Sequence, residues 1–378
     1  MSARSGWTHL YKYALNGTLT RTVTQGNFDV TDFYGYDING NAYYQAALPS
    51  PIDRTVYTSD KKGQTTALSK ENGFSSAIFA PENQYCVLSF SNIDLPPVYS
   101  IVNNKGKELR VLIDNSKYID KSQLNSKKEF LKVTDENGLE FNAYIIKPTD
   151  FDSTKKYPVI VYQYSGPGSL TVLNKWSKTW ENYYASKGYV IYCMDGRGTG
   201  GRGTAFMYPV YKHLGYYETI DQFAGARWLK QQNWVDSSRI GIHGWSYGGY
   251  ETLMCLQADN TPFSAGVAIA PVTDWKLYDS IYTERYMLTP QQNFDGYKTS
   301  APLNYTQKMH SDLLIMFGTA DDNVHPANTY EYISKLQFEG TLFDMMSFPN
   351  KNHSIYGCNA RAMVYANMFR FFNKALSK

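Results

Sequence analysis

The sequence predicts an α/β protein in which a doubly wound, mostly parallel sheet follows an all-β region. Three observations lead to this fold class. The chain has 378 residues, more than one ordinary domain needs. Short alternating runs separated by turn residues fill residues 7–115, and continuous apolar runs alternate with helical stretches beyond residue 127. We therefore expect an all-β domain at residues 1–120 and an α/β domain at residues 121–378.

The all-β region contains a loose internal repeat. Similar runs stand at residues 10–13 (LYKY), 56–59 (VYTS) and 98–101 (VYSI), each followed by a turn rich in Gly, Asn or Lys. Their spacing matches the roughly 40 to 50 residues of a β-propeller blade, and a β-sandwich is the alternative. Only two to two and a half repeats precede residue 115, whereas propellers close with about 4 to 8 blades. We expect the last blades of a propeller, whose ring cannot close within this chain.

The α/β region begins with a hairpin and continues with strands and helices in alternation. Residues 130–134 and 141–146 flank a turn of the Asn-Gly kind at residues 136–138. Continuous apolar runs are typical of parallel strands buried on both faces. Such strands are expected at residues 158–164, 189–194, 239–243, 266–270, 313–317 and 343–348, and helices at residues 217–232, directly after Ser246, at 327–338 and at 359–374.

The composition argues against several classes of function. Lys and Arg total 37 against 34 for Asp and Glu, so the net charge is only +3, and no run of like charge provides the basic patch that nucleic-acid binding needs. The four cysteines lie far apart without a C-x-x-C pair, which indicates neither a zinc site nor a redox pair. The sequence shows neither an apolar signal core at its start nor a run of about 18 apolar residues.

The strongest local motif is G-x-S-x-G at residues 244–248. It follows an apolar strand ending at residue 243 and opens a helix that continues through residue 254. This strand-turn-helix context predicts the nucleophile elbow of an α/β-hydrolase fold, with Ser246 as the nucleophile. Glycines beside the serine are expected because side chains in such a sharp turn would collide with neighbouring elements. A plain glycine-rich turn is the alternative.

A serine hydroxyl becomes a strong nucleophile when an imidazole accepts its proton and a carboxylate orients the imidazole. In this fold the acid and then the histidine follow the serine along the chain. His353 stands in the loop between the last expected strand and the last helix, where the general base belongs. For His310 and His325, the other downstream histidines, ordinary surface positions are expected.

The acid is expected at the end of the strand 313–317. The sequence there continues as GTADDN, which places Asp321 and Asp322 at the carboxyl edge of the sheet, where active-site loops gather. Adjacent loop residues can each point inward. The pattern alone therefore leaves Asp321 and Asp322 both open as the partner of His353.

Three strings of this region are similar to the dipeptidyl peptidases of the prolyl oligopeptidase family of serine peptidases. They are residues 244–249 (GWSYGG), 282–287 (YTERYM) and 318–325 (GTADDNVH). The likeness covers nearly all of residues 127–378, and the blades before it match the propeller of the same family. Strings of this length are highly specific.

The resemblance implies roles for residues of the catalytic site. The first aspartate of the pair, Asp321, would complete the triad, and Asp322 would cap a helix or brace the loop. The oxyanion hole would combine the backbone N–H of Tyr247 with the hydroxyl of Tyr164, because negative charge develops on the scissile carbonyl oxygen. Without the resemblance, Tyr164 reads as a core aromatic residue at a strand end.

The resemblance also places a pocket for a proline ring in this chain. Aromatic faces hold a flat pyrrolidine ring well, and a closed pocket rejects larger side chains. Asn323 would hydrogen-bond a substrate carbonyl. The implied pocket residues are Val272, Trp275, Tyr278, Tyr282 and Val324.

The sequence departs from the family in the groups that hold the substrate's amino terminus. Relatives use two adjacent glutamates on an early blade, and no Glu-Glu dipeptide occurs in the 378 residues. The arginine that grips the substrate carbonyl would also come from earlier blades. These absences predict a fragment with weak affinity for dipeptidyl substrates and slow esterase activity, since each lost charge-assisted hydrogen bond costs about 1.5 to 3 kcal/mol.

The resemblance implies a serine peptidase that releases X-Pro or X-Ala dipeptides from peptide N-termini through an acyl-enzyme, without a metal or organic cofactor. It also implies a homodimer located in the periplasm, outside the cell or at a cell surface. Two alternatives remain. One is an acylaminoacyl-peptidase or oligopeptidase of the same family, and the other is a non-catalytic binding or scaffold protein.

Overall fold

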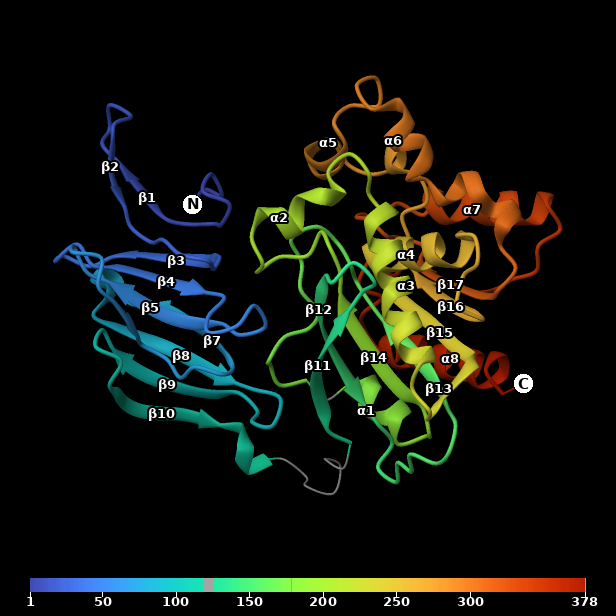
Figure 1. Ribbon diagram of the computed structural model, residues 1–378, viewed down its shortest axis with the longest axis horizontal. Helices are drawn as coiled ribbons and strands as arrows, with labels where there is room; N and C mark the ends of the chain where they lie inside the picture. The colour runs from blue at the N-terminus through green and yellow to red at the C-terminus, as the bar shows by residue number, and fades with distance from the viewer. Residues whose placement is uncertain (119–125, 178, 378) are drawn as a thin grey trace. The chain divides into compact units, whose positions relative to one another are not determined.

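The computed structural model describes residues 1–118, 126–177 and 179–377, and the chain divides into two compact units (Figure 1). We call them the β unit and the α/β unit and describe each by itself. The boundary expected between residues 120 and 121 lies outside the described residues. The β unit consists of Met1–Asn125, Val172–Lys178 and Thr199–Met207, and the α/β unit of Ser126–Thr171, Thr179–Gly198 and Tyr208–Lys378.

The β unit contains two four-stranded antiparallel sheets and a two-stranded hairpin. Each sheet is a meander, because its strands pair in the order in which they occur along the chain. The hairpin is β1 (Tyr11–Tyr13) and β2 (Leu19–Thr22); the first sheet is β3 (Val30–Tyr36), β4 (Ala42–Ala46), β5 (Thr55–Ser59) and β6 (Thr65–Ala67); the second is β7 (Phe74–Phe79), β8 (Tyr85–Ser91), β9 (Val98–Asn103) and β10 (Glu108–Asp114).

The internal repeat falls on the third strand of each sheet. β5 and β9 hold this position, and β1 pairs with β2 as β5 pairs with β6 and β9 with β10. A glycine with positive φ follows each of the three strands, at Gly17, Gly63 and Gly106. Two four-stranded sheets and one two-stranded hairpin, which corresponds to half a sheet, are therefore present. This confirms the expectation of two to two and a half repeats.

The first sheet is buried on both faces, which explains why every residue of β4 is buried. Successive side chains on a strand point to opposite faces. Tyr44 packs with Leu10 and Val23 on one face. Its neighbour Tyr43 packs with Leu88 of the second sheet on the other face. The packing follows from the stacking of successive sheets in the β unit.

The α/β unit is built on one eight-stranded sheet with the order β11-β12-β14-β13-β15-β16-β17-β18. β12 pairs antiparallel with β11 and β14, and all pairs from β14 to β18 are parallel. The expected hairpin and the six expected strands are all confirmed. Their bounds are β11 (Lys128–Thr134), β12 (Glu140–Ile146), β13 (Tyr157–Tyr162), β14 (Val190–Asp195), β15 (Val235–Trp245), β16 (Ala265–Ile269), β17 (Asp312–Gly318) and β18 (Asp344–Phe348).

Helices cover both faces of this sheet (Figure 1). A Cβ at Gly241 of β15 would meet Phe372 of the last helix, whereas a Cβ at Gly266 of β16 would meet Leu256 of the helix after Ser246. Gly266 pairs with Ile242, the residue after Gly241. Gly241 and Gly266 therefore lie on opposite faces of the sheet. The doubly wound arrangement is thus confirmed, and glycine is used where a helix packs closely on the sheet.

The four expected helices are confirmed as α3, α4, α7 and α8. Shorter helices that the pattern had not indicated lie in the loops. In the described residues, no helix is both long and apolar enough to span a membrane. The helices are α1 (Trp180–Ala185), α2 (Thr204–Met207, in the β unit), α3 (Tyr216–Lys230), α4 (Tyr247–Gln257), α5 (Ser280–Met287), α6 (Phe294–Thr299), α7 (Ala327–Phe338) and α8 (Ala360–Ala375).

Candidate active site

Ser246 occupies a sharp turn between β15, which ends at Trp245, and α4, which begins at Tyr247. Its backbone has φ 63° and ψ −118°. A residue with a side chain rarely adopts this conformation, and it persists only where the surrounding structure enforces it. The backbone N–H of Ser246 donates to the carbonyl of Ile269 at 2.8 Å, which fixes the turn to the neighbouring strand β16.

The glycines of the motif are required by close contacts. A Cβ at Gly248 would lie 2.5 Å from the carbonyl oxygen of Gln163, which follows β13. A Cβ at Gly244 would collide with the backbone of Gly248 itself. Such contacts are shorter than side chains tolerate, so the turn can be this tight only with glycine at both positions.

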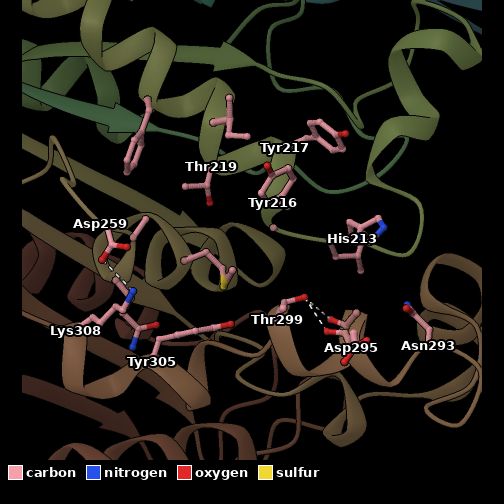
Figure 2. Close-up of a pocket in the computed structure, with 18 residues that line it drawn as sticks. His213, Tyr216, Tyr217, Thr219, Asp259, Asn293, Asp295, Thr299, Tyr305 and Lys308 are labelled. Atoms are coloured by element: carbon pink, nitrogen blue, oxygen red, sulfur yellow. Dashed lines mark hydrogen bonds and ion pairs between the residues drawn. The ribbon is translucent and has the colours of Figure 1, made fainter.

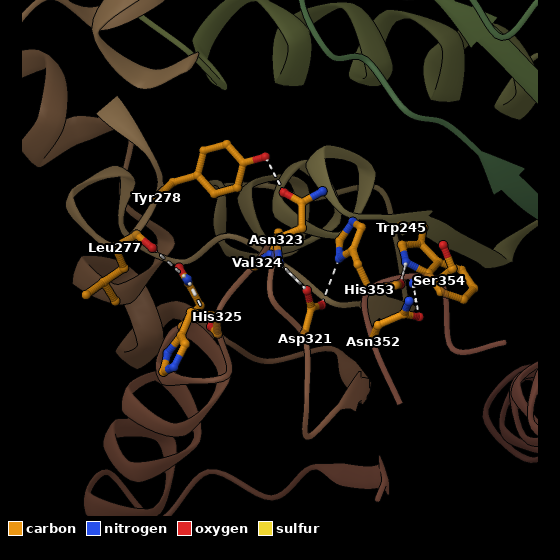
Figure 3. A network of polar contacts seen from close by, with 11 residues as sticks. Trp245, Leu277, Tyr278, Asp321, Asn323, Val324, His325, Asn352, His353 and Ser354 are labelled. Carbon is orange, nitrogen blue, oxygen red and sulfur yellow. Dashed lines mark hydrogen bonds and ion pairs between the residues drawn. The ribbon is translucent and has the colours of Figure 1, made fainter. Parts of the chain in front are cut away.

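Asp321 and His353 come together at the carboxyl edge of the sheet (Figure 3). The carboxylate Oδ2 of Asp321 lies 2.7 Å from Nδ1 of His353. The other oxygen accepts the backbone N–H groups of Asn323 at 3.0 Å and Val324 at 2.9 Å. Asp321 is only 3% exposed, so its carboxylate organises its own loop and faces the imidazole at the same time.

His353 is also held close to the serine turn through its backbone. The indole N–H of Trp245, the residue before Ser246, donates to the carbonyl of His353 at 3.0 Å (Figure 3). The loop after β18 is therefore attached directly to the end of β15. This contact brings the candidate base to the same sheet edge as the candidate nucleophile.

The alternative acid and bases lie elsewhere. Asp322 and His310 are exposed. His325 is exposed as well, and its Nδ1 accepts the backbone N–H of Ala327 at 3.2 Å at the start of α7. The structure thus places Asp321, and not Asp322, against His353.

Tyr164 stands just after β13, which ends at Tyr162. Burial raises the pKa of its hydroxyl, and a side-chain hydrogen bond with Ser246 opposes this rise without cancelling it. Its ring centroid lies 6.1 Å from that of Tyr247. The rings of Tyr164 and Tyr247 are therefore close to each other beside the serine turn.

The five residues implied for the proline pocket gather in one aromatic cluster. Val272, Trp275 and Val324 are buried, and Tyr278 and Tyr282 pack against them together with Tyr164. The ring of Trp275 is stacked on that of Tyr282 with centroids 6.0 Å apart, and it meets the edge of Tyr278 at 5.9 Å. The cluster presents the aromatic faces that suit a flat apolar ring.

Asn323 has a defined orientation beside this cluster. Its Oδ1 accepts the hydroxyl of Tyr278 at 2.6 Å (Figure 3). The amide NH2 is thereby left as the donor end of the side chain. A substrate carbonyl is the kind of group that this end can bind.

The sequence analysis missed Glu218, a fully buried carboxylate in the first turn of α3. Its Oε1 accepts the hydroxyl of Tyr247 at 2.7 Å. Burial raises the pKa of Glu218 to about 7, although the hydrogen bond from Tyr247 lowers it. The helical pattern of α3 could not reveal this residue, because Glu218, Asp221 and Gln222 are polar and yet face the protein interior.

A separate cavity of about 920 Å³ opens beside the start of α3 (Figure 2). Leu214, Thr219 and Met254 line one side of it. An ion pair of 2.9 Å joins Lys308 and Asp259 on another side. None of the residues predicted for catalysis or binding lines this cavity.

None of the four cysteines takes part in a disulfide. Cys86, Cys193 and Cys255 are buried free thiols and Cys358 is an exposed one. Within the described ranges, no three His, Cys, Asp or Glu side chains are grouped so that they could hold a metal ion. The groups placed together around Ser246 are those of nucleophilic catalysis.

Comparison with known proteins gives matches to both parts of the chain. Residues 176–378 match the prolyl oligopeptidase family, and residues 1–97 match the N-terminal region of dipeptidyl peptidase IV. A probable dipeptidyl-aminopeptidase B from Arthroderma gypseum is 37% identical over 96% of this chain and 41% of its own length. A putative dipeptidyl aminopeptidase from Schizosaccharomyces pombe is 35% identical over 100% of this chain and 49% of its own length.

Two solved structures with similar names also match nearly the whole of this chain. The dipeptidyl peptidase 4 of Porphyromonas gingivalis superposes with a TM-score of 0.96 at 45% identity, over 99% of this chain and 54% of that chain. A putative dipeptidyl aminopeptidase IV from Bacteroides ovatus gives 0.88 at 30% identity, over 99% and 56%. The chain spans about two fifths to half of the length of the curated relatives cited above. With its propeller strands, its hydrolase sheet and its serine elbow, the chain belongs to the prolyl oligopeptidase family and is similar within it to dipeptidyl peptidase IV.

Proposed function

We propose that this chain carries the catalytic part of a serine peptidase that releases dipeptides with Pro or Ala in second position from peptide N-termini. The observation that carries the proposal is the 2.7 Å contact of Asp321 with His353, attached through Trp245 to the strained turn of Ser246. A carboxylate, an imidazole and a serine in this order are what nucleophilic acyl transfer needs.

In the proposed reaction, Ser246 attacks the carbonyl carbon of the scissile bond while His353 accepts the hydroxyl proton. Asp321 accepts the Nδ1–H of His353, which leaves Nε2 free to act as the base and stabilises the imidazolium that forms. The oxyanion is stabilised by the Tyr164 hydroxyl and the Tyr247 backbone N–H. His353 then donates the proton to the leaving amine, and water hydrolyses the acyl-enzyme by the same steps.

The aromatic cluster supports the choice of substrate. A proline side chain has no polar group to satisfy, and Trp275, Tyr278 and Tyr282 offer rings against which it can pack. Alanine would fit the same space with fewer contacts. The NH2 of Asn323 would bind the carbonyl of the preceding residue, because Tyr278 occupies its other end.

These 378 residues contain no Glu-Glu pair that could bind the amino terminus of a substrate. We therefore expect the chain alone to cleave dipeptidyl anilides poorly and simple esters slowly. An ammonium without a carboxylate partner loses hydrogen bonds worth about 1.5 to 3 kcal/mol each. Cleavage of Ala-Pro anilides by this chain as efficient as that of its longer relatives would contradict the expectation.

A homodimer active outside the cytoplasm, in the periplasm or at a cell surface, is part of the same proposal. β18 forms one end of the eight-stranded sheet. Near it, Phe338, Leu342 and Met345 are exposed by 91%, 92% and 47%. Apolar side chains gathered at a sheet edge favour association with another protein surface. Sedimentation equilibrium should give twice the chain mass, and a monomer at micromolar concentration would contradict this part.

Labelling by a fluorophosphonate tests whether the site is catalytic. We expect the chain to be labelled at Ser246 and the Ser246→Ala variant to remain unlabelled. A non-catalytic scaffold protein would give no label in either. Hydrolysis of Ala-Pro anilide by the protein, compared with its N-acetylated form, separates the dipeptidyl peptidase from an acylaminoacyl-peptidase or oligopeptidase, because only the latter two accept a blocked amino terminus.

A further inference from the structure

We propose that Glu218 is a positioning residue for substrate selection: it holds the Tyr247 ring in place as the wall between the catalytic serine and the aromatic pocket. The inference rests on the proposed function and adds a specificity residue to it. Its basis is the buried hydrogen bond in which the Tyr247 hydroxyl donates to Glu218 Oε1 at 2.7 Å. Glu218 itself would touch no substrate atom.

Tyr247 stands at the junction of the two parts of the site. Its ring centroid lies 6.1 Å from Tyr164, the candidate oxyanion donor, and 5.5 Å from Trp275 of the pocket. It also meets the edge of Tyr250 at 5.1 Å. A rotation of this ring would therefore change the pocket and the surroundings of Ser246 together.

The carboxylate of Glu218 lies in the protein interior, where a negative charge is energetically unfavourable. Glu218 and Tyr247 are 0% and 2% exposed, and burial raises the pKa of Glu218 to about 7. The described part of the chain shows no hydrogen-bond partner for its Oε2. A buried carboxylate without a cation lowers stability, so packing alone does not account for Glu218, whereas the need to orient the Tyr247 hydroxyl does.

The nearby charged groups do not provide another partner. Asp221 is paired with Arg197, whose side chain donates to it. Glu251 of α4 is also fully buried, and its Oε1 accepts from Thr219 and Cys255. Glu251 is therefore a matched control: it is a buried glutamate of the same region, and its Oε1 accepts from Thr219 and Cys255, which are not residues of the aromatic pocket.

The segment that begins α3 borders a cavity as well as the aromatic cluster. The cavity of Figure 2 is lined by Leu214, Tyr217 and Thr219 from this segment. Close packing normally restrains a side chain from all directions. Leu214 and Tyr217 pack in the same hydrophobic cluster as Tyr247, and the hydrogen bond from Tyr247 to Glu218 adds a directed restraint between α3 and this ring.

The experiment compares hydrolysis of Ala-Pro and Ala-Ala p-nitroanilides by the protein and its variants Glu218→Ala, Glu218→Gln, Tyr247→Phe and Glu251→Gln. Both substrates use the same triad and the same amino terminus, and they differ in the ring that fills the pocket. The ratio of kcat/KM for Pro over Ala therefore reports on the pocket. Active sites are counted by fluorophosphonate labelling, and kcat is calculated per labelled site, so that misfolded protein does not lower its value.

We expect the Pro/Ala ratio to fall roughly 10-fold in Glu218→Ala and in Tyr247→Phe, the effect of one lost buried hydrogen bond. In Glu218→Gln the ratio should stay within about 2-fold, because an amide oxygen also accepts a hydroxyl. Glu251→Gln should leave it unchanged. If Glu218→Ala does not fold, Tyr247→Phe removes the same hydrogen bond from the other side.

An unchanged ratio in Tyr247→Phe, or in a folded Glu218→Ala, would overturn the inference while leaving the peptidase proposal intact. An equal loss with both substrates would also overturn it, since that result indicates a purely structural role. If the unmodified protein cleaves neither anilide and the fluorophosphonate does not label Ser246, the proposed function fails and this inference falls with it. The outcomes are thus distinguishable.

Discussion

Asp321 is placed to serve both its own loop and the proposed reaction. One oxygen accepts two backbone N–H groups, from Asn323 and Val324, and the other faces Nδ1 of His353. The backbone bonds fix the carboxylate in one orientation before a substrate arrives. In physical terms this is preorganisation, because no side chain has to be reoriented during the proton transfer.

Replacing Asp321 by Asn should abolish most activity without unfolding the loop. The amide oxygen can still accept both backbone N–H groups, but its NH2 cannot accept the Nδ1–H of His353, so the imidazole adopts the wrong tautomer. We expect kcat for Ala-Pro p-nitroanilide to fall about 10⁴-fold. The exposed neighbour provides the control, since Asp322→Asn should keep kcat within about 2-fold. Similar losses in both variants would argue against the assignment of Asp321.

Tyr278 is expected to act through Asn323 as well as through its ring. Tyr278→Phe keeps the ring but releases the amide, which can then rotate away from its donor orientation. KM for Ala-Pro p-nitroanilide should rise roughly 10-fold with kcat little changed, the cost of one misdirected hydrogen bond. Tyr330→Phe, at a half-exposed tyrosine of α7, is the control. An unchanged KM in Tyr278→Phe would show that Asn323 is oriented by other means.

At the scale of elements, the hairpins of both units share one turn design. The side chain of the last residue of the strand, or of the residue directly after it, accepts backbone N–H groups two and four positions later. Asp37 binds Asn39 and Asn41 in this way, both at 2.9 Å. The same pattern recurs at Asp60, Asn103 and Asp135. Each turn then carries a glycine with positive φ, so the local sequence determines the hairpin.

Asp37→Ala should destabilise the β unit more than Asp37→Asn, which keeps an acceptor for the backbone N–H groups. Burial would raise the pKa of Asp37, but hydrogen bonds from Asn41, Tyr43 and Asn39 outweigh it and lower the pKa. Loss of these acceptors leaves backbone N–H groups unpaired and should cost about 1 to 3 kcal/mol of unfolding free energy. Asn103 holds the same turn position with an amide, which is why Asn is the matched control. Denaturant unfolding followed by proteolysis of the β unit measures both variants, and equal stability would contradict the role.

The hydrophobic pattern of α3 does not show which of its residues are buried. The helix was expected and is present, but its interior side includes Glu218, Asp221 and Gln222. Each is accommodated by a specific partner: Tyr247, Arg197 and the carbonyl of Met194. Hydrophobic periodicity identifies helices whose inward side is apolar, and it places such polar residues in solvent. Their burial depends on partners from distant parts of the chain.

At the scale of the whole molecule, two buried titratable groups of the α/β unit give opposite pH dependences. The folded-state pKa of Glu218 is about 7 against an ordinary 4.5, so its favourable term is complete below pH 4.5 and is lost as the pH rises to 7. Burial lowers the pKa of His243 to about 4 from 6.5, although a contact with Val267 opposes this. Its favourable term is complete above pH 6.5 and is lost as the pH falls to 4.

The two effects oppose each other between pH 4.5 and 6.5, and single variants should separate them. In His243→Gln the unfolding free energy of the α/β unit, relative to the parent, should fall by about 3 kcal/mol as the pH rises from 4 to 6.5, because the term from His243 is gone. In Glu218→Gln the unfolding free energy relative to the parent should instead rise by a similar amount between pH 4.5 and 7. Urea unfolding at several pH values measures both, with the exposed Glu331→Gln as control. Parallel curves for all variants would contradict the assignment.

Much of this protein was accessible from the sequence. The positions of the eight strands along the chain follow from runs and turns that carry their signal locally, and the elbow at residues 244–249 predicts a serine nucleophile from the sequence alone. The repeat at residues 10–13, 56–59 and 98–101 likewise indicated the blades. These features depend on interactions between residues that are near one another in the chain, so a single sequence contains them.

Only the tertiary structure decided which groups meet. The pattern left Asp321 and Asp322 open, and the structure places Asp321 against His353, 32 positions away. It also placed Glu218 under Tyr247, which no local pattern indicated. Orientation at a loop and the burial of a polar side chain depend on distances and partners across the fold. Such long-range contacts have no periodic signature, and they become visible only when the sheet brings the loop ends together.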